Sequence, residues 1–239
     1  MAKAIIIDTE TTGKTDDAQV IEMAYIQLED VPSTVSVAKF CSLYKPTASI
    51  ALGAMATHHI LPSMLEDQRS HECAAGDVPD AEYWVGHNID VDWNWLGRPN
   101  VKLIDTLSMS RALFPDLDSH TQSAMIYYYG LGVGKPERAK DLLKGAHSAL
   151  ADVENCHRVL SMLLAVCRQR SIPVDTWEEI YAFSEEARIP SIMPFSTKFK
   201  GKPVSEVDQG FRDWYRKQDN QDKYILAAFD RYPYGGWAK

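Results

Sequence analysis

The feature that most constrains the fold is a short apolar run close to the start of the sequence. Residues 4–7 are wholly apolar and largely β-branched, and they lead directly into Asp8, Thr9 and Glu10. A run of this length and composition predicts a buried strand that delivers polar side chains at its end. A fold built around a central sheet is therefore expected.

The order of the other predicted elements indicates a mixed sheet. Strands are predicted at 20–28, 35–44, 83–86 and 101–104. Helices are predicted as two short segments within 49–66, at 106–113, and from 148 to about 168. The short separations favour an antiparallel three-stranded start, and the later strands alternate with helices. This order predicts an α/β fold with helices packed against the sheet.

The composition changes towards the end of the sequence. Residues 175–188 predict a bridging helix, which Pro190 closes. Residues 190–239 hold nine Lys or Arg against six Asp or Glu, a net charge of +3, so the first 189 residues carry −11 of a total of −8. We predict a main domain at 1–170, a linker at 171–190 and a small basic and aromatic domain at 191–239.

The overall composition is that of a soluble globular protein, with 45% apolar and 24% charged residues. The four cysteines show no CxxC spacing, which favours reduced thiols in a cytoplasmic protein over disulfides or zinc. No apolar run approaches the roughly 18 residues of a membrane span, so no membrane partner is expected. The acidic balance argues against broad binding of a nucleic-acid backbone by the first domain.

Asp8 and Glu10 are the first candidate site residues. They are two positions apart on a predicted strand, so their side chains leave the same face. Two neighbouring carboxylates repel each other unless a cation lies between them. Hard oxygen ligands of this kind suit Mg²⁺ or Mn²⁺. An acidic pair at the surface end of a strand is the alternative interpretation.

A second acidic segment follows the predicted strand at 83–86. The sequence there is His87-Asn88-Ile89-Asp90-Val91-Asp92, which would place Asp92 at the start of a helix near the end of the sheet. Spacing alone does not choose between Asp92 and Asp90. Either residue could also serve simply as a helix cap.

The third segment contains His147 and Asp152. Five residues at about 100° each would place the two side chains roughly 140° apart on a continuous helix. They converge only if His147 lies on the loop before the helix, with Ser148 as the N-cap. Asp152 would then be a fixed metal ligand, and His147 would be able to approach a water molecule. A solvated loop histidine is the alternative.

Together, the segments at 5–13, 87–92 and 147–152 resemble the DnaQ-like exonuclease superfamily, in its DEDDh branch. The family pattern HNxxxD selects Asp92 over Asp90. Ser148 stands where the Tyr branch of the family requires tyrosine, so the His branch is preferred. Ile89 and Val91 depart from the usual alanine and aromatic residue, without touching a ligand position. The resemblance implies an RNase H-like fold.

The resemblance also implies a two-metal mechanism, in which two Mg²⁺ ions act on the scissile phosphate and Mn²⁺ can substitute. Asp8 would bridge both ions, Glu10 and Asp152 would complete one site, and Asp92 would serve the second. His147 would be the general base.

The expected activity is that of a 3′→5′ exodeoxyribonuclease acting on single-stranded or frayed duplex DNA ends in repair or end processing. An exoribonuclease that trims RNA is the alternative, and a non-catalytic binding module is a further one that the intact carboxylates oppose. A homodimer is compatible with the resemblance. The expected substrate-binding residues are Thr9, Thr11, Thr12, Met55, His58 and Asn88. For Met55 and His58, helix packing is an equal alternative to a nucleotide contact.

The end of the sequence resembles the C-terminal region of the bacterial exodeoxyribonuclease X group, over residues 193–207 and 211–215. Ser196 stands where the related sequences have glycine. The interleaved lysines suggest a DNA contact. The aromatic residues are expected to form the core of a domain too small to spare them: Phe195, Phe199, Phe211 and Trp214.

Overall fold

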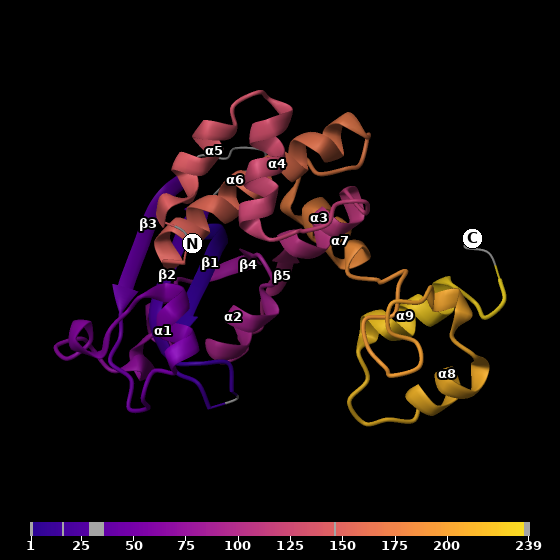
Figure 1. The fold of residues 1–239 in the computed structure, drawn as a ribbon, viewed down its shortest axis with the longest axis horizontal. Coiled ribbons are helices and arrows are strands. Elements are labelled where there is room, and N and C mark those ends of the chain that lie inside the picture. The colour runs from indigo at the N-terminus through magenta and orange to yellow at the C-terminus, as the bar shows by residue number, and fades with distance from the viewer. Residues whose placement is uncertain (1, 16, 29–35, 146, 237–239) are drawn as a thin grey trace. The chain divides into compact units, whose positions relative to one another are not determined.

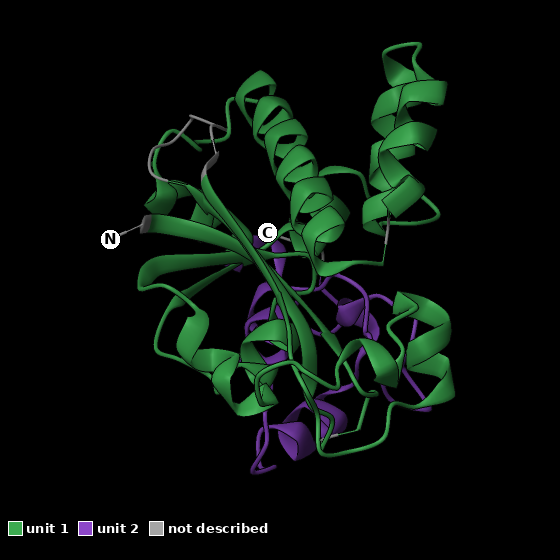
Figure 2. Cartoon of the chain, turned by 90° about the vertical axis from the view of Figure 1, so that its left-hand side faces the viewer, with its two compact units in different colours: residues 1–184 green, residues 185–239 purple. Residues whose placement is uncertain are grey.

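The computed structural model describes residues 2–15, 17–28, 36–145 and 147–236. The chain divides into two compact units, residues 1–184 and 185–239, which Figure 2 shows in different colours. The predicted bridging helix is α7 (Trp177–Ala187), and the boundary between the units falls within it. The division at 1–170, 171–190 and 191–239 stays a prediction.

The described part of the first unit contains a five-stranded sheet in the order β3-β2-β1-β4-β5 (Figure 1). The strands are β1 (Ala2–Thr11), β2 (Val20–Leu28), β3 (Ser36–Leu43), β4 (Ala81–Gly86) and β5 (Lys102–Asp105). The first three are antiparallel, whereas β4 and β5 run parallel to β1. The predicted mixed sheet with an antiparallel start is confirmed. Val35, the first residue of one predicted strand, lies outside the described residues.

Strand β1 is the central strand of the sheet, and its apolar side chains are buried on both faces. Ile5 and Ile7 pack with Trp84 and Ile89 on one face. Helix α6 (Ala149–Gln169) contacts β1 and β2, and it supplies the other layer. The strand also continues beyond its predicted end, because pairing with β2 extends as far as Thr11. Both early carboxylates therefore lie within the strand and are held in its register.

The other α-helices in the described part of the first unit are α1 (Leu52–His58), α2 (Asp90–Trp95), α3 (Thr106–Leu113), α4 (Gln122–Gly132) and α5 (Pro136–Leu142). The predictions for 106–113 and for 148 to about 168 are confirmed within a residue or two. Helices α4 and α5 were not predicted. In α4, apolar residues lie on every side, so no polar face marks its period. None of the helices in the described part of the chain is long and apolar enough to cross a membrane.

The second unit is a small body containing α8 (Gln209–Tyr215) and α9 (Lys223–Arg231). Its core includes Phe199 and Phe229, and it also encloses Arg212, of which 2% is exposed. The guanidinium donates four hydrogen bonds of 2.7–2.8 Å to the carbonyl oxygens of Val204, Val207, Phe229 and Tyr232. These bonds satisfy the buried charge and join α8 to the segments on either side of it.

Candidate metal centre

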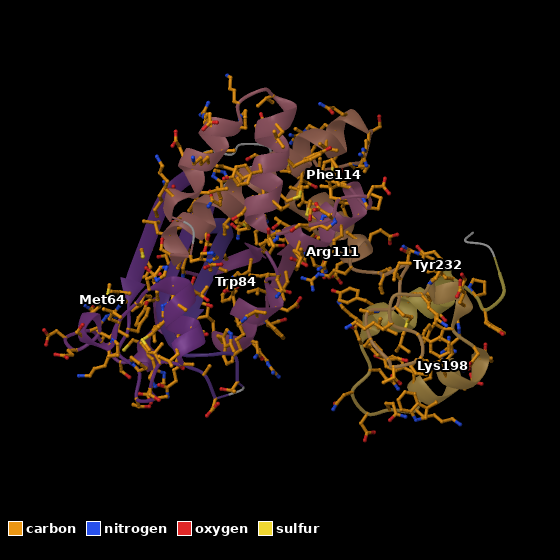
Figure 3. All side chains as sticks on the ribbon, in the orientation of Figure 1. Met64, Trp84, Arg111, Phe114, Lys198 and Tyr232 are labelled. Atoms are coloured by element: carbon orange, nitrogen blue, oxygen red, sulfur yellow. The ribbon has the colours of Figure 1, made fainter. Side chains whose placement is uncertain are left out.

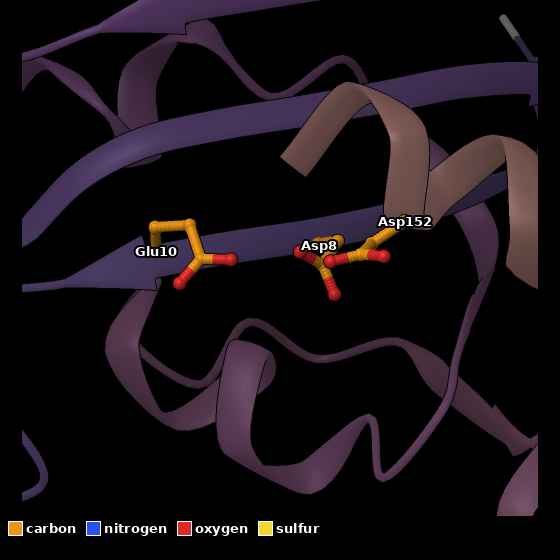
Figure 4. A group of neighbouring side chains, drawn as sticks. All are labelled: Asp8, Glu10 and Asp152. Atoms are coloured by element: carbon orange, nitrogen blue, oxygen red, sulfur yellow. The ribbon is translucent and has the colours of Figure 1, made fainter. Parts of the chain in front are cut away.

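Three carboxylates from two elements meet on one face of the sheet. Asp8 and Glu10 lie on β1, and Asp152 lies on the first turns of α6 (Figure 4). One ligand oxygen from each of the three lies within 4.8 Å of the others. The prediction that Asp8 and Glu10 share a face is confirmed, because the ligand oxygens of both lie together in this group. The group could hold a metal ion.

Helix α6 begins between His147 and Asp152, so Asp152 lies in the helix and His147 lies before it. Ser148 is the N-cap, and its hydroxyl accepts a hydrogen bond of 3.4 Å from the backbone N–H of Ala151. His147 lies outside the helix with a φ of 71°, and its side chain is exposed. Its backbone N–H donates to Asp152 Oδ2 over 3.1 Å. The histidine is therefore on the preceding loop, as predicted, and is joined to Asp152 through its main chain.

Glu22 is a further carboxylate beside this group. The sequence predicts no specific role for it. It lies opposite Glu10 on β2, and only 9% of it is exposed. Glu22 Oε2 accepts a hydrogen bond of 2.8 Å from the N–H of Ala149, the first residue of α6. A negative charge at a helix N-terminus is stabilising. Glu22 thus joins the sheet to the helix that carries Asp152. In the sequence, the only sign of this role is that Glu22 is the single acidic residue within the mainly apolar stretch 20–28.

The fourth carboxylate, Asp92, lies on α2 and is hydrogen-bonded to Thr9 of β1. It is the third residue of α2, it is 6% exposed, and Oδ1 accepts from the backbone N–H of Thr9 (2.8 Å) and from its hydroxyl (2.7 Å). Asp90, on the same helix, is exposed. The N-cap position of α2 is Ile89, and Asp92 lies three positions further along, inside the helix, so Asp92 is not the N-cap residue that was considered as an alternative. Its carboxylate lies beside the residue between Asp8 and Glu10.

The turn before α2 is held by polar contacts. Asn88 has a φ of 75°, and its backbone N–H donates to Asp105 Oδ1 over 2.7 Å. Asp105 also caps α3. The ring of His87 bonds to Thr106 Oγ1 (2.9 Å) and to the carbonyl oxygen of His120 (2.7 Å). These contacts fix the path of the chain into α2, and therefore the place of Asp92.

The predicted substrate-binding threonines are engaged within the chain. Besides Thr9, which bonds to Asp92, the hydroxyl of Thr11 donates to the carbonyl oxygen of Gly13 over 2.6 Å. Thr12 is buried, and its hydroxyl accepts from the N–H of Gln19 over 3.0 Å. These bonds shape the turn after β1. Contacts of these threonines with a substrate stay predictions.

The two predicted nucleotide contacts on α1 differ in burial. His58 is 6% exposed, and its Nδ1 accepts from the N–H of Ile60 over 2.9 Å. Met55 is half-buried against the apolar cluster around Ile21 and Ile50. Asn88, by contrast, is exposed. Packing therefore accounts for His58 as the structure has it, and Met55 retains some accessible surface.

The carboxylates of the group have pKa values above their usual range. Burial is the largest cause of the raised pKa of Asp8, and four neighbouring carboxylates add to it: Asp92, Asp152, Glu10 and Glu22. Burial, followed by the charges of Asp152, Glu22 and Asp92, raises the pKa of Glu10 to about 8.

The pKa values of the other two carboxylates are also raised, and hydrogen bonds to their charged forms partly oppose the shift. Burial raises the pKa of Asp92 to about 7, against the hydrogen bonds from Thr9. Burial raises the pKa of Asp152 to about 6, and His147 opposes this shift. Such a set of carboxylates, crowded and partly removed from water, favours a bound cation.

Comparison with known proteins identifies the family. The exonuclease family model RNase_T matches residues 5–160, a segment that contains the four carboxylates and His147. The chain therefore belongs to the exonuclease family, and it is a nuclease by this assignment. The resemblance to DnaQ-like exonucleases is confirmed.

Individual relatives agree with this assignment. The 3′-5′ exonuclease DinG of Staphylococcus aureus is 24% identical over 91% of this chain, which spans about a quarter (24%) of that relative's length. The structure of Exonuclease X in complex with 5′ overhanging duplex DNA has 25% identity and a TM-score of 0.56, covering 74% of this chain and 99% of that one. Escherichia coli Exonuclease I in complex with a dT13 oligonucleotide has 16% identity and a TM-score of 0.55, covering 72% and 43%. The predicted RNase H-like fold is confirmed.

Proposed function

We propose that this chain is a 3′→5′ exodeoxyribonuclease that removes nucleotides from DNA ends with two divalent metal ions. The observation that carries the proposal is the convergence of Asp8, Glu10 and Asp152 within 4.8 Å, with Asp92 bonded to the same strand. Mg²⁺ is the proposed ion, and Mn²⁺ is expected to substitute for it, because every donor is a hard carboxylate oxygen.

The four carboxylates divide into two sets. Asp8 would serve both ions, Glu10 and Asp152 would complete the first site, and Asp92 would serve the second. Bound there, the ions supply activation of the attacking water and stabilisation of the leaving 3′ oxygen. The raised pKa values of Asp8 and Glu10 support this assignment, since the group carries uncompensated repulsion without a cation.

His147 is the proposed general base. Its main chain is bonded to Asp152, whereas its imidazole is exposed on the loop before α6. An exposed ring on this loop would be able to approach a water molecule near the carboxylates and accept its proton.

The relatives support the direction of cleavage and the polymer. DinG is named as a 3′-5′ exonuclease, and the solved structures of Exonuclease X and Exonuclease I contain DNA. We infer single-stranded or frayed duplex DNA as the substrate, in repair or end processing. Among the expected nucleotide contacts, Asn88 is exposed and Met55 is half-buried, so both retain surface that a nucleotide could contact.

The test uses DNA and RNA oligonucleotides of one sequence, labelled at either end, with the full chain in Mg²⁺ or in EDTA. We expect 5′-labelled DNA to shorten progressively, and 3′-labelled DNA to release a labelled mononucleotide at once. Both reactions should require Mg²⁺. Cleavage from the 5′ end, or equal activity in EDTA, would refute the proposal. Faster cleavage of RNA than of DNA would make the chain an exoribonuclease.

A further inference from the structure

The second unit exposes aromatic side chains that its core does not use. Phe199 is buried with 3% exposed, as expected for a core residue. Trp214, in contrast, is 53% exposed, and Phe195 is 36% exposed. Of the tryptophans that the structure describes, only Trp214 is exposed. The expectation that all four aromatic residues form the core is therefore wrong for these two. Trp214 therefore lies on the solvent-exposed side of α8.

The exposed rings are part of one continuous series of ring contacts. Phe211 lies against Trp214, with ring centroids 5.3 Å apart, and against Phe199 at 5.1 Å. Phe195 packs against Tyr215 at 5.6 Å, and Tyr215 in turn lies 6.4 Å from Phe211. We call Phe195, Phe211 and Trp214 the aromatic surface.

A lysine-rich loop adjoins the aromatic surface. Lys198, labelled in Figure 3, lies on this loop. Its ammonium lies 4.8 Å from the centroid of Phe199 and pairs with Asp208. Lys200 and Lys202 are exposed on the same loop, and within residues 185–236 neither forms an ion pair with a carboxylate. The region therefore offers cations that are not neutralised by the unit itself.

The loop and α8 are held in place. Ser196 has a φ of 85°, a region that favours glycine, and its hydroxyl accepts from the N–H groups of Lys198 and Phe199, each over 3.2 Å. The turn therefore forms without the glycine of related sequences. Arg212 fixes α8 on its buried side through hydrogen bonds to four carbonyl oxygens. Rings and cations carried on a rigid scaffold lose little entropy on binding.

We propose that the aromatic surface and the loop at 198–202 form a second binding surface for single-stranded nucleic acid, distinct from the carboxylate group. Exposed rings stack on bases of any sequence, and lysines beside them contact the phosphates. Residues 190–239 carry a net charge of +3, in a chain whose other residues carry −11. Aromatic residues are also enriched at protein interfaces, but lysine is depleted there, so rings combined with lysines favour nucleic acid over a protein partner.

The first test measures binding of fluorescein-labelled oligothymidylate to the full chain by anisotropy, in EDTA so that no cleavage occurs. Trp214→Ala is expected to weaken binding about tenfold, the effect of losing one stacked base. Trp214→Phe keeps a ring and should recover most of the affinity. Tyr234→Ala is the matched control, since Tyr234 is 57% exposed in the same unit, and it should leave binding unchanged.

The second test separates stacking from charge. Replacing both Lys200 and Lys202 by alanine should reduce the slope of log K against log salt by about 0.7 for each phosphate that these lysines neutralise in the wild type. Trp214→Ala should lower the affinity at every salt concentration without changing that slope. A double variant with an unchanged slope would contradict the role of the loop.

The proposal is overturned if folded Trp214→Ala binds the oligonucleotide as tightly as the wild type. It is also overturned if that variant converts a dimer to a monomer with binding unchanged, because the surface would then hold a second copy. Hydrolysis of a mononucleotide ester reports on the carboxylate group alone and should be equal in Trp214→Ala and wild type. An inactive wild type on that ester would instead refute the proposed exonuclease.

Discussion

Replacing Glu10 by glutamine should make the metal-free protein more stable at about pH 8. Burial, together with the negative charges of Asp152, Glu22 and Asp92, raises the pKa of Glu10 from 4.5 to about 8. At 1.36 kcal/mol per pKa unit, ionising this group in the folded protein costs at most about 5 kcal/mol. Glutamine removes the charge but is itself a polar group to bury, so we expect a gain of about 2 kcal/mol.

The gain should depend on pH in one direction. The pKa of Glu10 is higher in the folded state than in the unfolded state, so the folded state keeps a proton that the unfolded state releases. This contribution to stability is fully present below about pH 4.5 and is lost as the pH rises through about 8. The difference between Glu10→Gln and wild type should therefore be smallest at about pH 4 and largest above pH 8.

Urea unfolding in EDTA, followed by circular dichroism across this pH range, measures the difference. Mg²⁺ should reverse the order, because an ion at one hundred times its dissociation constant stabilises the wild type by about 2.7 kcal/mol. The variant has lost one ligand and should gain less. If Glu10→Gln were no more stable than wild type in EDTA at about pH 8, or if Mg²⁺ stabilised both equally, the reasoning would be wrong.

Substitutions at three further positions test single contacts of the site. Thr9→Val removes a hydroxyl that lowers the pKa of Asp92, so Mg²⁺ binding by calorimetry should weaken several-fold at neutral pH and recover at higher pH; an equal loss at both would contradict the pKa argument. His147→Ala should slow cleavage about 10²–10⁴-fold while Mn²⁺ affinity is kept, and a parallel loss of both would show that it acts on the ligands. Glu22→Ala leaves the Ala149 N–H without its acceptor and should cost about 1–3 kcal/mol in urea unfolding, whereas Glu22→Gln should recover at least half.

Local patterns predicted the elements whose neighbours do not alter them. Strand β2 and helix α3 begin and end where the pattern of apolar residues places them. Strand β1 does not, because its polar residues beyond Ile7 resemble a strand end, while pairing with β2 continues to Thr11. Helix α4 lacks a polar face and so gives no periodic signal.

The site shows the same limit more sharply. The motif residues were recognisable as segments, but the bond from Thr9 to Asp92 spans 83 residues and that from Ala149 to Glu22 spans 127. No local pattern encodes such contacts. The preference for Asp92 over Asp90 came from a family pattern, and the structure adds a physical reason to test, since Asp92 is bonded to β1 and Asp90 is exposed.

The central claim is that the carboxylates on β1 carry out metal-dependent removal of nucleotides from a 3′ end. Its most direct test is the single-turnover rate of 3′-end cleavage in Mg²⁺ for Asp8→Asn beside Asp90→Asn, which removes the same charge from an exposed position. We predict that Asp8→Asn loses at least about a thousandfold in rate, equivalent to about 4 kcal/mol of transition-state stabilisation. Asp90→Asn should match the wild type. An Asp8→Asn protein that keeps the wild-type rate, or an Asp90→Asn protein that loses it, would contradict the account.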